Sequence, residues 1–142
     1  KLRPVLIRAG SLGYGLPERD MMVSPNHRML IRSAQASLMF DEHEVLAAAK
    51  HLTGIDGIEK QAVDAVTYVH VMCERHQVVL ANGSWTESFQ PGDMAMDGID
   101  AAQREELFSI FPDLREAEGR ASYGSARKIL KSFEARMLAS MR

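Results

Sequence analysis

Apolar residues in the first two thirds of the chain come in short runs that glycine and proline interrupt, a pattern typical of short strands. Residues 3–8 and 29–32 are two such runs. The glycines at positions 10, 13 and 15 and the proline at position 17 predict a loop before Asp20. This part of the chain is therefore predicted to be mainly β.

Asn82 and Gly83 predict a type I′ turn, because both central residues of that turn need a positive φ. The flanking residues 77–81 and 84–89 have the composition of two paired strands. Residues 66–72 are rich in β-branched side chains and predict a further strand. His76 is thus expected near the start of a strand, where sheet pairing holds it.

Local signals between residues 41 and 52 favour a helix. Asp41 is a suitable N-cap, Glu44 follows three positions later, and alanines come next. Gly54 and Gly57 then predict a turn. Taken alone, this segment is an exception to the strand pattern around it.

The pattern changes from strand to helix after residue 92. Asp100 and Gln103 predict a capped helix that ends at Pro112. Ser125 is expected to cap a second helix, whose apolar residues recur at helical spacing: Ile129, Leu130, Phe133, Met137, Leu138 and Met141. We therefore predict two domains, a β domain at residues 1–92 and a helical tail at 93–142 that packs on it. The basic outer face of the second helix leaves binding to a membrane surface or a partner open.

Composition excludes several classes of protein. With 142 residues and 46% hydrophobic content, the chain can bury one core and carry an appendage. No apolar run approaches the roughly 18 residues of a membrane-spanning helix. The net charge of -2, with acids and bases interspersed, predicts no nucleic-acid partner. Cys73 is the only cysteine, so an internal disulfide is excluded.

Ser24 and His27 are the first candidates for chemistry. A protein that breaks its own chain must stabilise an oxyanion and protonate the departing nitrogen, and a hydroxyl and an imidazole can serve these two needs. Pro25 fixes one dihedral angle, and Asn26 tolerates an unusual one, so a tight turn can bring Ser24 and His27 together. Ser-x-x-His alone is nevertheless a common sequence.

Two blocks of sequence together resemble the Hint (hedgehog/intein) self-processing fold. The first is Ser24-Pro-Asn-His-Arg-Met-Leu30, similar to the Thr-x-x-His block of that family. The second runs from Tyr68 through His76 to the Asn-Gly turn, and Glu-Ser-Phe at residues 87–89 follows it. This combination resembles a bacterial Hint subfamily with a Ser-Pro-x-His block, over residues 1–92. The resemblance implies a Hint-like β fold with a C-terminal α-helical tail.

The resemblance also changes the interpretation of single segments. It implies a strand through Val45 and Leu46 and a short helical turn near Lys50, instead of a helix from Asp41. In Hint domains the first block polarises the scissile amide. The resemblance therefore implies a processing site at Ser24, His27 and His76. His70 partly covers the role of an aspartate that the family has where this chain has Val69.

The resemblance implies autocatalytic self-cleavage by an acyl shift, which needs no cofactor. Hint processing starts with a cysteine or serine at the first residue of the domain, whereas this chain begins with Lys1. Cys73 lies in a predicted strand and is more simply a small core residue. We therefore expect the nucleophile, and its partner peptide bond, in an upstream segment of the same polypeptide. This chain by itself is expected to be inert. Bacterial relatives imply a secreted parent protein.

Full protein splicing is not expected. Splicing needs a terminal His-Asn pair, and the corresponding strand here has the sequence Ser-Trp-Thr-Glu at residues 84–87. Two alternatives stay open. In one, the domain is a processing-dead scaffold that serves as an interaction module of a larger secreted protein. In the other, His27, His70 and His76 form a zinc site, although none of them has the close spacing of a usual ligand pair.

Overall fold

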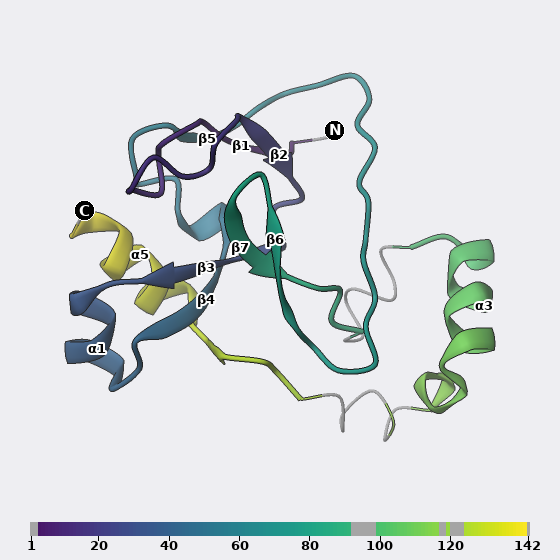
Figure 1. The fold of residues 1–142 in the computed structure, drawn as a ribbon. Helices are drawn as coiled ribbons and strands as arrows, with labels where there is room; N and C mark the ends of the chain where they lie inside the picture. Colours follow the sequence, from purple (N-terminus) through teal and green to yellow (C-terminus); the bar gives the residue numbers. More distant parts are fainter. Residues whose placement is uncertain (1–2, 92–98, 117–118, 120–123, 142) are drawn as a thin grey trace. The chain divides into compact units, whose positions relative to one another are not determined.

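The computed structural model describes residues 3–91, 99–116, 119 and 124–141 (Figure 1). Within this range the protein is mainly β, as predicted, with a helix near its C-terminus. The chain forms two compact units. We call Lys1–Val69, Val78–Glu87 and Arg127–Arg142 the β unit, and His70–Gln77 with Ser88–Ala126 the helical unit. Each unit is described separately.

A three-stranded antiparallel sheet forms one part of the β unit. Its order is β2 (Met21–Val23), β1 (Val5–Ile7) and β5 (Ile58–Lys60). The central strand buries Val5 and Ile7 completely. The sequence predicted β1 and the loop that follows it, where Gly10, Gly13 and Gly15 have positive φ. It did not predict β2 and β5.

The second sheet of the β unit has the order β6, β7, β3, β4 and β8. These strands are Val78–Ala81, Ser84–Glu87, Arg28–Arg32, Glu44–Ala48 and Lys128–Ile129. The hairpin β6–β7 is confirmed, with φ of 49° at Asn82 and 78° at Gly83, as a type I′ turn requires. Strand β7 meets β3 where Thr86 pairs with Met29. This pairing brings the end of the hairpin beside the start of β3.

The helix predicted from Asp41 is wrong. A helix, α1 (Ala34–Phe40), ends there instead, and Asp41 is its C-cap with φ of 55°. The chain continues as β4 and then as the 3₁₀ turn η1 (Ala49–His51), as the Hint resemblance implied. The β4 residues from Val45 to Ala47 are fully buried between neighbouring elements. Burial in a central strand therefore outweighs the helix propensity of the alanines.

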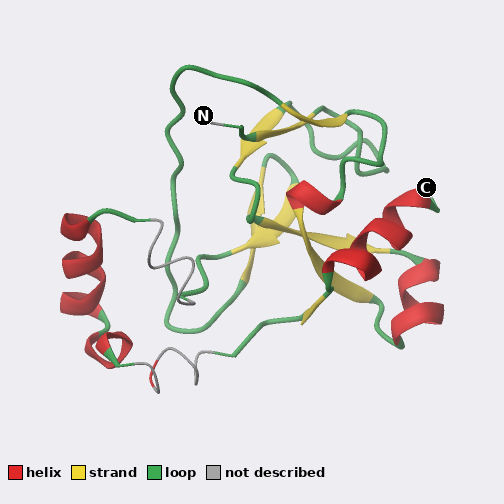
Figure 2. Ribbon diagram, turned by 180° about the vertical axis from the view of Figure 1, so that it is seen from behind, coloured by secondary structure: helices red, strands yellow, loops and turns green. Residues whose placement is uncertain are grey.

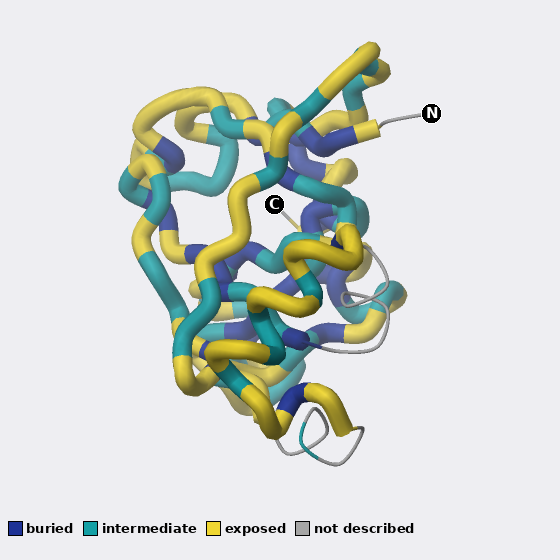
Figure 3. Tube along the Cα trace, turned by 90° about the vertical axis from the view of Figure 1, so that its right-hand side faces the viewer, coloured by how far each residue is buried: buried dark blue, intermediate teal, exposed yellow. Residues whose placement is uncertain are grey.

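The strand predicted at residues 66–72 is also wrong, because the structure has no strand there. Residues 62–75 are exposed or half-buried, in yellow and teal in Figure 3, and Val69 is 83% exposed. β-Branched residues favour strands mainly through packing on a half-buried surface. This segment has no such surface, so its composition misled the prediction.

One helix of the second half was predicted correctly. Helix α3 (Ala101–Ile110) starts with a complete capping box, in which Gln103 N–H donates to the Asp100 carboxylate at 2.8 Å. It is followed by the 3₁₀ turn η2 (Pro112–Arg115). Both belong to the helical unit.

The last helix, α5 (Ser132–Ser140), begins later than predicted. Ser125 does not cap it, because residues 128–129 form β8, which pairs in parallel with β4. The Glu134 side chain accepts from the Lys131 N–H at 2.8 Å and closes the first turn of the helix. Helix α5 packs against β4 and η1 through Ala135, Leu138 and Ala139 (Figure 2). None of the described helices is long and apolar enough to cross a membrane.

Candidate functional site

The Ser-Pro-Asn-His block forms the tight turn that the sequence predicted. The His27 N–H donates to the Ser24 carbonyl at 3.0 Å. Two backbone bonds from η1 fix the turn from outside: Ala49 N–H donates to the His27 carbonyl at 2.8 Å, and Lys50 N–H donates to the Pro25 carbonyl at 3.0 Å. The N–H and the carbonyl of His27 are therefore both hydrogen-bonded, directly before the start of β3.

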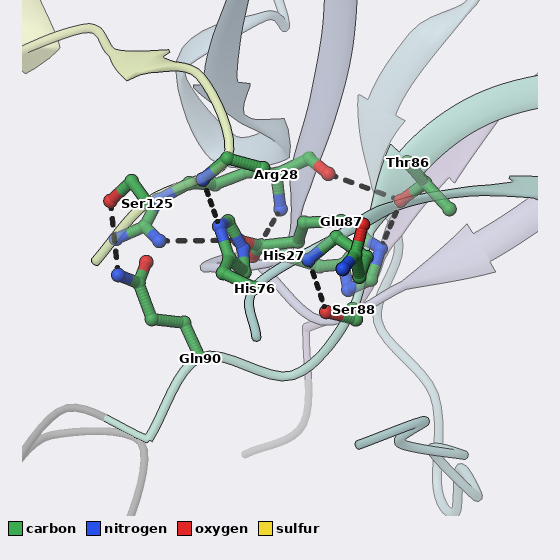
Figure 4. Close-up of polar contacts among 10 residues, drawn as sticks. His27, Arg28, His76, Thr86, Glu87, Ser88, Gln90 and Ser125 are labelled. Carbon is green, nitrogen blue, oxygen red and sulfur yellow. Dashed lines mark hydrogen bonds and ion pairs between the residues drawn. The ribbon is translucent and has the colours of Figure 1, made fainter. Parts of the chain in front are cut away.

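The His27 ring is held by a side chain from β7. Its Nε2 forms a hydrogen bond with Thr86 Oγ1 (Figure 4). Thr86 is 4% exposed, and its hydroxyl donates its only proton to the Arg28 carbonyl, at 3.1 Å. Its oxygen can then only accept from His27, and this hydrogen-bond pattern assigns the ring proton to Nε2. In the neutral ring, Nδ1 is the nitrogen with the lone pair.

An ion pair lies directly beside this bond. Glu87 Oε1 accepts from the Arg28 N–H at 2.9 Å, and Oε2 pairs with the Arg28 guanidinium at 3.2 Å (Figure 4). The Glu87 side chain is 8% exposed, so its charge is largely shielded from water. The two bonds satisfy this carboxylate and fix the backbone of Arg28, whose carbonyl is the acceptor for Thr86.

The sequence did not predict the roles of Thr86 and Glu87. The sequence predicted residues 84–89 as a strand and gave Glu87 a place in the Glu-Ser-Phe match, but it indicated no contact of Thr86 or Glu87 with the turn at His27. A signal was present: three polar residues, Thr86, Glu87 and Ser88, follow each other where a buried strand is usually apolar. All three are buried, so they had to find polar partners.

His76 is buried in the helical unit, with 4% of its surface exposed. It precedes β6, and sheet pairing does not hold it, contrary to the prediction. Its Nδ1 accepts a hydrogen bond from the Ala126 N–H at 2.9 Å (Figure 4). Because Nδ1 accepts, the ring proton is on Nε2. The donor lies far outside the segment that resembles Hint domains, which no local pattern around His76 could indicate.

The chain beside His76 is fixed by Ser88. The Gln77 N–H donates to the Ser88 hydroxyl at 2.9 Å, and the Ser88 N–H donates to the Gln77 carbonyl at 2.8 Å. The Gln90 amide donates to the Ser125 hydroxyl at 3.0 Å, one residue before Ala126. These bonds connect residues 76–77 and 88–90 with residues 125–126 inside the helical unit (Figure 4).

His70 has a different environment. Its ring contacts the Phe89 ring edge to face, with centroids 5.0 Å apart, in the same unit as His76. Partial burial lowers the pKa of His70 below its ordinary value. The four predicted site residues thus form two pairs: Ser24 and His27 belong to the β unit, and His70 and His76 to the helical unit.

The described residues contain no group of three histidine, cysteine, aspartate or glutamate side chains that could hold a metal ion. The structure therefore offers no support, within those residues, for the zinc alternative at His27, His70 and His76.

A comparison with protein families gives one match. The sequence model of the Hint domain matches residues 1–93, which is the segment that the two sequence blocks predicted. No curated protein and no solved structure matches the chain. The match covers about two thirds of the protein and agrees with its mainly β architecture. The chain belongs to the Hint domain family, whose members are generally self-processing.

Proposed function

We propose that this chain is the C-terminal part of a self-processing domain that assists an acyl shift at a peptide bond upstream. Residues 1–92 form the processing domain in this proposal, and residues 93–142 are its tail. A cysteine or serine in an upstream segment of the same polypeptide supplies the nucleophile. His27 transfers the proton, and Ser24 lies in the same turn. Assisting roles for His70 and His76 are proposed from the resemblance to Hint domains.

The observation that carries the proposal is the state of the His27 ring. Its Nε2–H is committed to Thr86, and the backbone on both sides of the ring is hydrogen-bonded. Such a ring takes and gives protons through Nδ1 without giving up its hydrogen bond to Thr86. Histidine is suited to this role, because the unperturbed imidazole gives and takes protons near neutral pH.

The reaction conserves protons. The thiol or hydroxyl of the nucleophile forms a bond to the carbonyl carbon and gives its proton to His27 Nδ1. The carbon–nitrogen bond then breaks, and Nδ1 returns the proton to the departing nitrogen, which leaves as an amine. The products are a thioester or ester and a new amino terminus. His27 ends in its starting state, so one proton passes through it without any cofactor.

Splicing is not part of the proposal. The strand that ends in His-Asn in splicing domains contributes Thr86 and Glu87 in this chain, and both side chains bind the turn at His27 and Arg28. There is no asparagine at this place whose side chain could cyclise. Cleavage is therefore expected to end with water or another acceptor taking the acyl group.

Intact mass of the full-length gene product tests the proposal. In thiol we expect two fragments from the wild type, and a cleavage rate about a hundredfold or more lower in His27→Ala, since general acid–base catalysis contributes about that much. His43→Ala is the matched control, because His43 is an exposed histidine of the same unit. Equal rates in His27→Ala and His43→Ala would contradict the proposal.

Exposed apolar side chains on α5 support the alternative, a processing-dead interaction module. Helix α5 leaves Phe133 64% exposed and Met137 48% exposed. An uncleaved full-length product in the same mass experiment, with or without thiol, would favour that alternative. Thiol-dependent cleavage that His27→Ala abolishes would exclude it.

A further inference from the structure

We infer that Thr86 is a positioning residue for His27: its hydroxyl selects the Nε2–H tautomer of the ring and leaves Nδ1 as the nitrogen that exchanges protons. The catalytic consequence of this inference rests on the proposed function, whereas the tautomer itself does not. Thr86 lies on the strand that in splicing domains carries the His-Asn pair, so the strand here has a different task.

The Thr86 hydroxyl is firmly oriented. Its proton points to the Arg28 carbonyl, at 3.1 Å. That carbonyl cannot move easily, because Glu87 holds the Arg28 N–H at 2.9 Å and the guanidinium at 3.2 Å. Arg28 also pairs with Ala48 in the register of β3 and β4. The hydroxyl oxygen therefore presents a lone pair, and no proton, to His27.

Thr86 itself is fixed by the sheet. It is opposite Met29 in β3 and opposite Val79 in β6, so strands on both sides set its position. It is also 4% exposed, and water competes little for its hydroxyl. A buried hydrogen bond of this kind is costly to leave unmade, because the remaining donor and acceptor then lack partners. The Thr86 hydroxyl oxygen is thus a fixed acceptor for His27 Nε2.

The bond to Thr86 is compatible with both charge states of His27. A neutral ring with its proton on Nε2 donates to Thr86, and an imidazolium donates through the same N–H. Proton uptake at Nδ1 therefore leaves the bond intact. An acceptor at Nε2 also stabilises the charged ring, which helps His27 hold the proton between its two transfers.

The ring tautomer can be measured on this 142-residue chain by the ¹⁵N chemical shifts of the histidine rings. We expect His27 to have the proton on Nε2 in the wild type and in Thr86→Ser, which keeps the hydroxyl. In Thr86→Val, which has nearly the same shape without the hydroxyl, we expect a mixture of tautomers. Thr67→Val is the matched control, because Thr67 is exposed and lies in the same unit.

Cleavage of the full-length gene product gives the second measurement. We expect Thr86→Val to cleave about threefold to tenfold more slowly than the wild type, the effect of one hydrogen bond. We also expect the pH of half-maximal rate to fall, since the imidazolium has lost an acceptor. Thr86→Ser should restore both values. A purely structural role would lower the rate equally at every pH.

The two measurements separate the possible failures. A wild-type His27 with its proton on Nδ1, or a single unchanged tautomer in Thr86→Val, would overturn the inference; the wild-type result holds even if Thr86→Val does not fold. A tautomer lost in Thr86→Val while the wild-type gene product does not cleave would support the positioning by Thr86 and contradict the proposed function. A lost tautomer with an unchanged pH profile of cleavage would overturn the catalytic part of the inference.

Discussion

The hydrogen-bond partners assign the ring proton of both His27 and His76 to Nε2, but the structure holds the two rings in opposite ways. His27 donates through Nε2 to a side chain of a neighbouring strand. His76 accepts at Nδ1 from the backbone N–H of Ala126. The first bond survives when the ring takes a second proton, whereas the second must break, because protonated Nδ1 can no longer accept. The same tautomer is thus suited to two different tasks.

This difference assigns the tasks within the proposed reaction. His27 is suited to carry a proton in and out at Nδ1. His76, which accepts at Nδ1, is suited to act as a donor through its Nε2–H. The origins of the two partners also differ: Thr86 lies within the segment that matches the Hint domain, and Ala126 lies outside it. The family fold supports one imidazole, and a segment beyond it supports the other.

The largest effect on stability is expected where the His27 turn is tied to β7. Glu87→Ala leaves the Arg28 guanidinium and N–H without their carboxylate. We expect a loss of about 2–3 kcal/mol in the free energy of unfolding, below the range for a fully buried pair because Arg28 reaches solvent. Urea unfolding measures it. Glu59→Ala is the matched control, since its 2.7 Å pair with Arg8 is exposed and such a pair contributes little to stability. Equal losses would show that Glu87 does not brace the turn.

Ala126→Pro removes the backbone N–H that donates to His76 Nδ1, and with it the hydrogen bond that holds this ring. We expect a loss of about 1–3 kcal/mol, the cost of a buried acceptor without a partner, together with a changed ¹⁵N shift of His76 Nδ1. The His27 signals should stay as they are, because a different residue holds that ring. Ala126→Gly keeps the N–H and serves as the control. A His76 signal that is the same in both variants would contradict the assigned partner.

The smallest effect concerns pH, at the 3₁₀ turn that anchors the His27 backbone. His51 Nδ1 is buried without a hydrogen-bond partner among the described residues, and burial, followed by the charges of Lys50, Arg136 and Lys60, lowers the pKa of His51. The unfolded chain therefore binds a proton that the folded chain resists. Stability is complete well above the unfolded pKa of about 6.5 and declines as the pH falls through it.

His51→Gln tests this expectation, because glutamine does not titrate. Urea unfolding at a series of pH values from neutral to acidic should give a smaller decline for His51→Gln than for the wild type. His43→Gln, at an exposed histidine of the same unit, should decline as the wild type does. A decline in His51→Gln as large as in the wild type would mean that other groups cause it.

Sequence patterns predicted the features whose causes are local. The type I′ turn at Asn82 and Gly83 and the capping box at Asp100 depend on a few adjacent residues, and both are confirmed. The helix predicted from Asp41 was wrong because burial of β4 overrides propensity, which local signals do not contain. The Hint resemblance gave the correct answer there, since it includes the whole fold.

In the candidate site, too, local features could be predicted from the sequence and long-range contacts could not. The turn from Ser24 to His27 was predictable because its chemistry lies in four adjacent residues. The partners of the two imidazoles were not, because Thr86 is 59 residues from His27 and Ala126 is 50 residues from His76. The strand register places Thr86 beside His27, and Ala126, beyond the Hint segment, contacts His76. Sequence alone therefore indicated which rings matter but not what orients them.

The central claim is that His27 passes the proton of the acyl shift, and cleavage of the full-length His27→Ala gene product in thiol, with and without added imidazole, tests it most directly. The account predicts that cleavage falls at least about a hundredfold in His27→Ala and that imidazole, entering the space of the missing ring, restores part of the rate. His27→Ala that cleaves as fast as the wild type without imidazole would contradict the account.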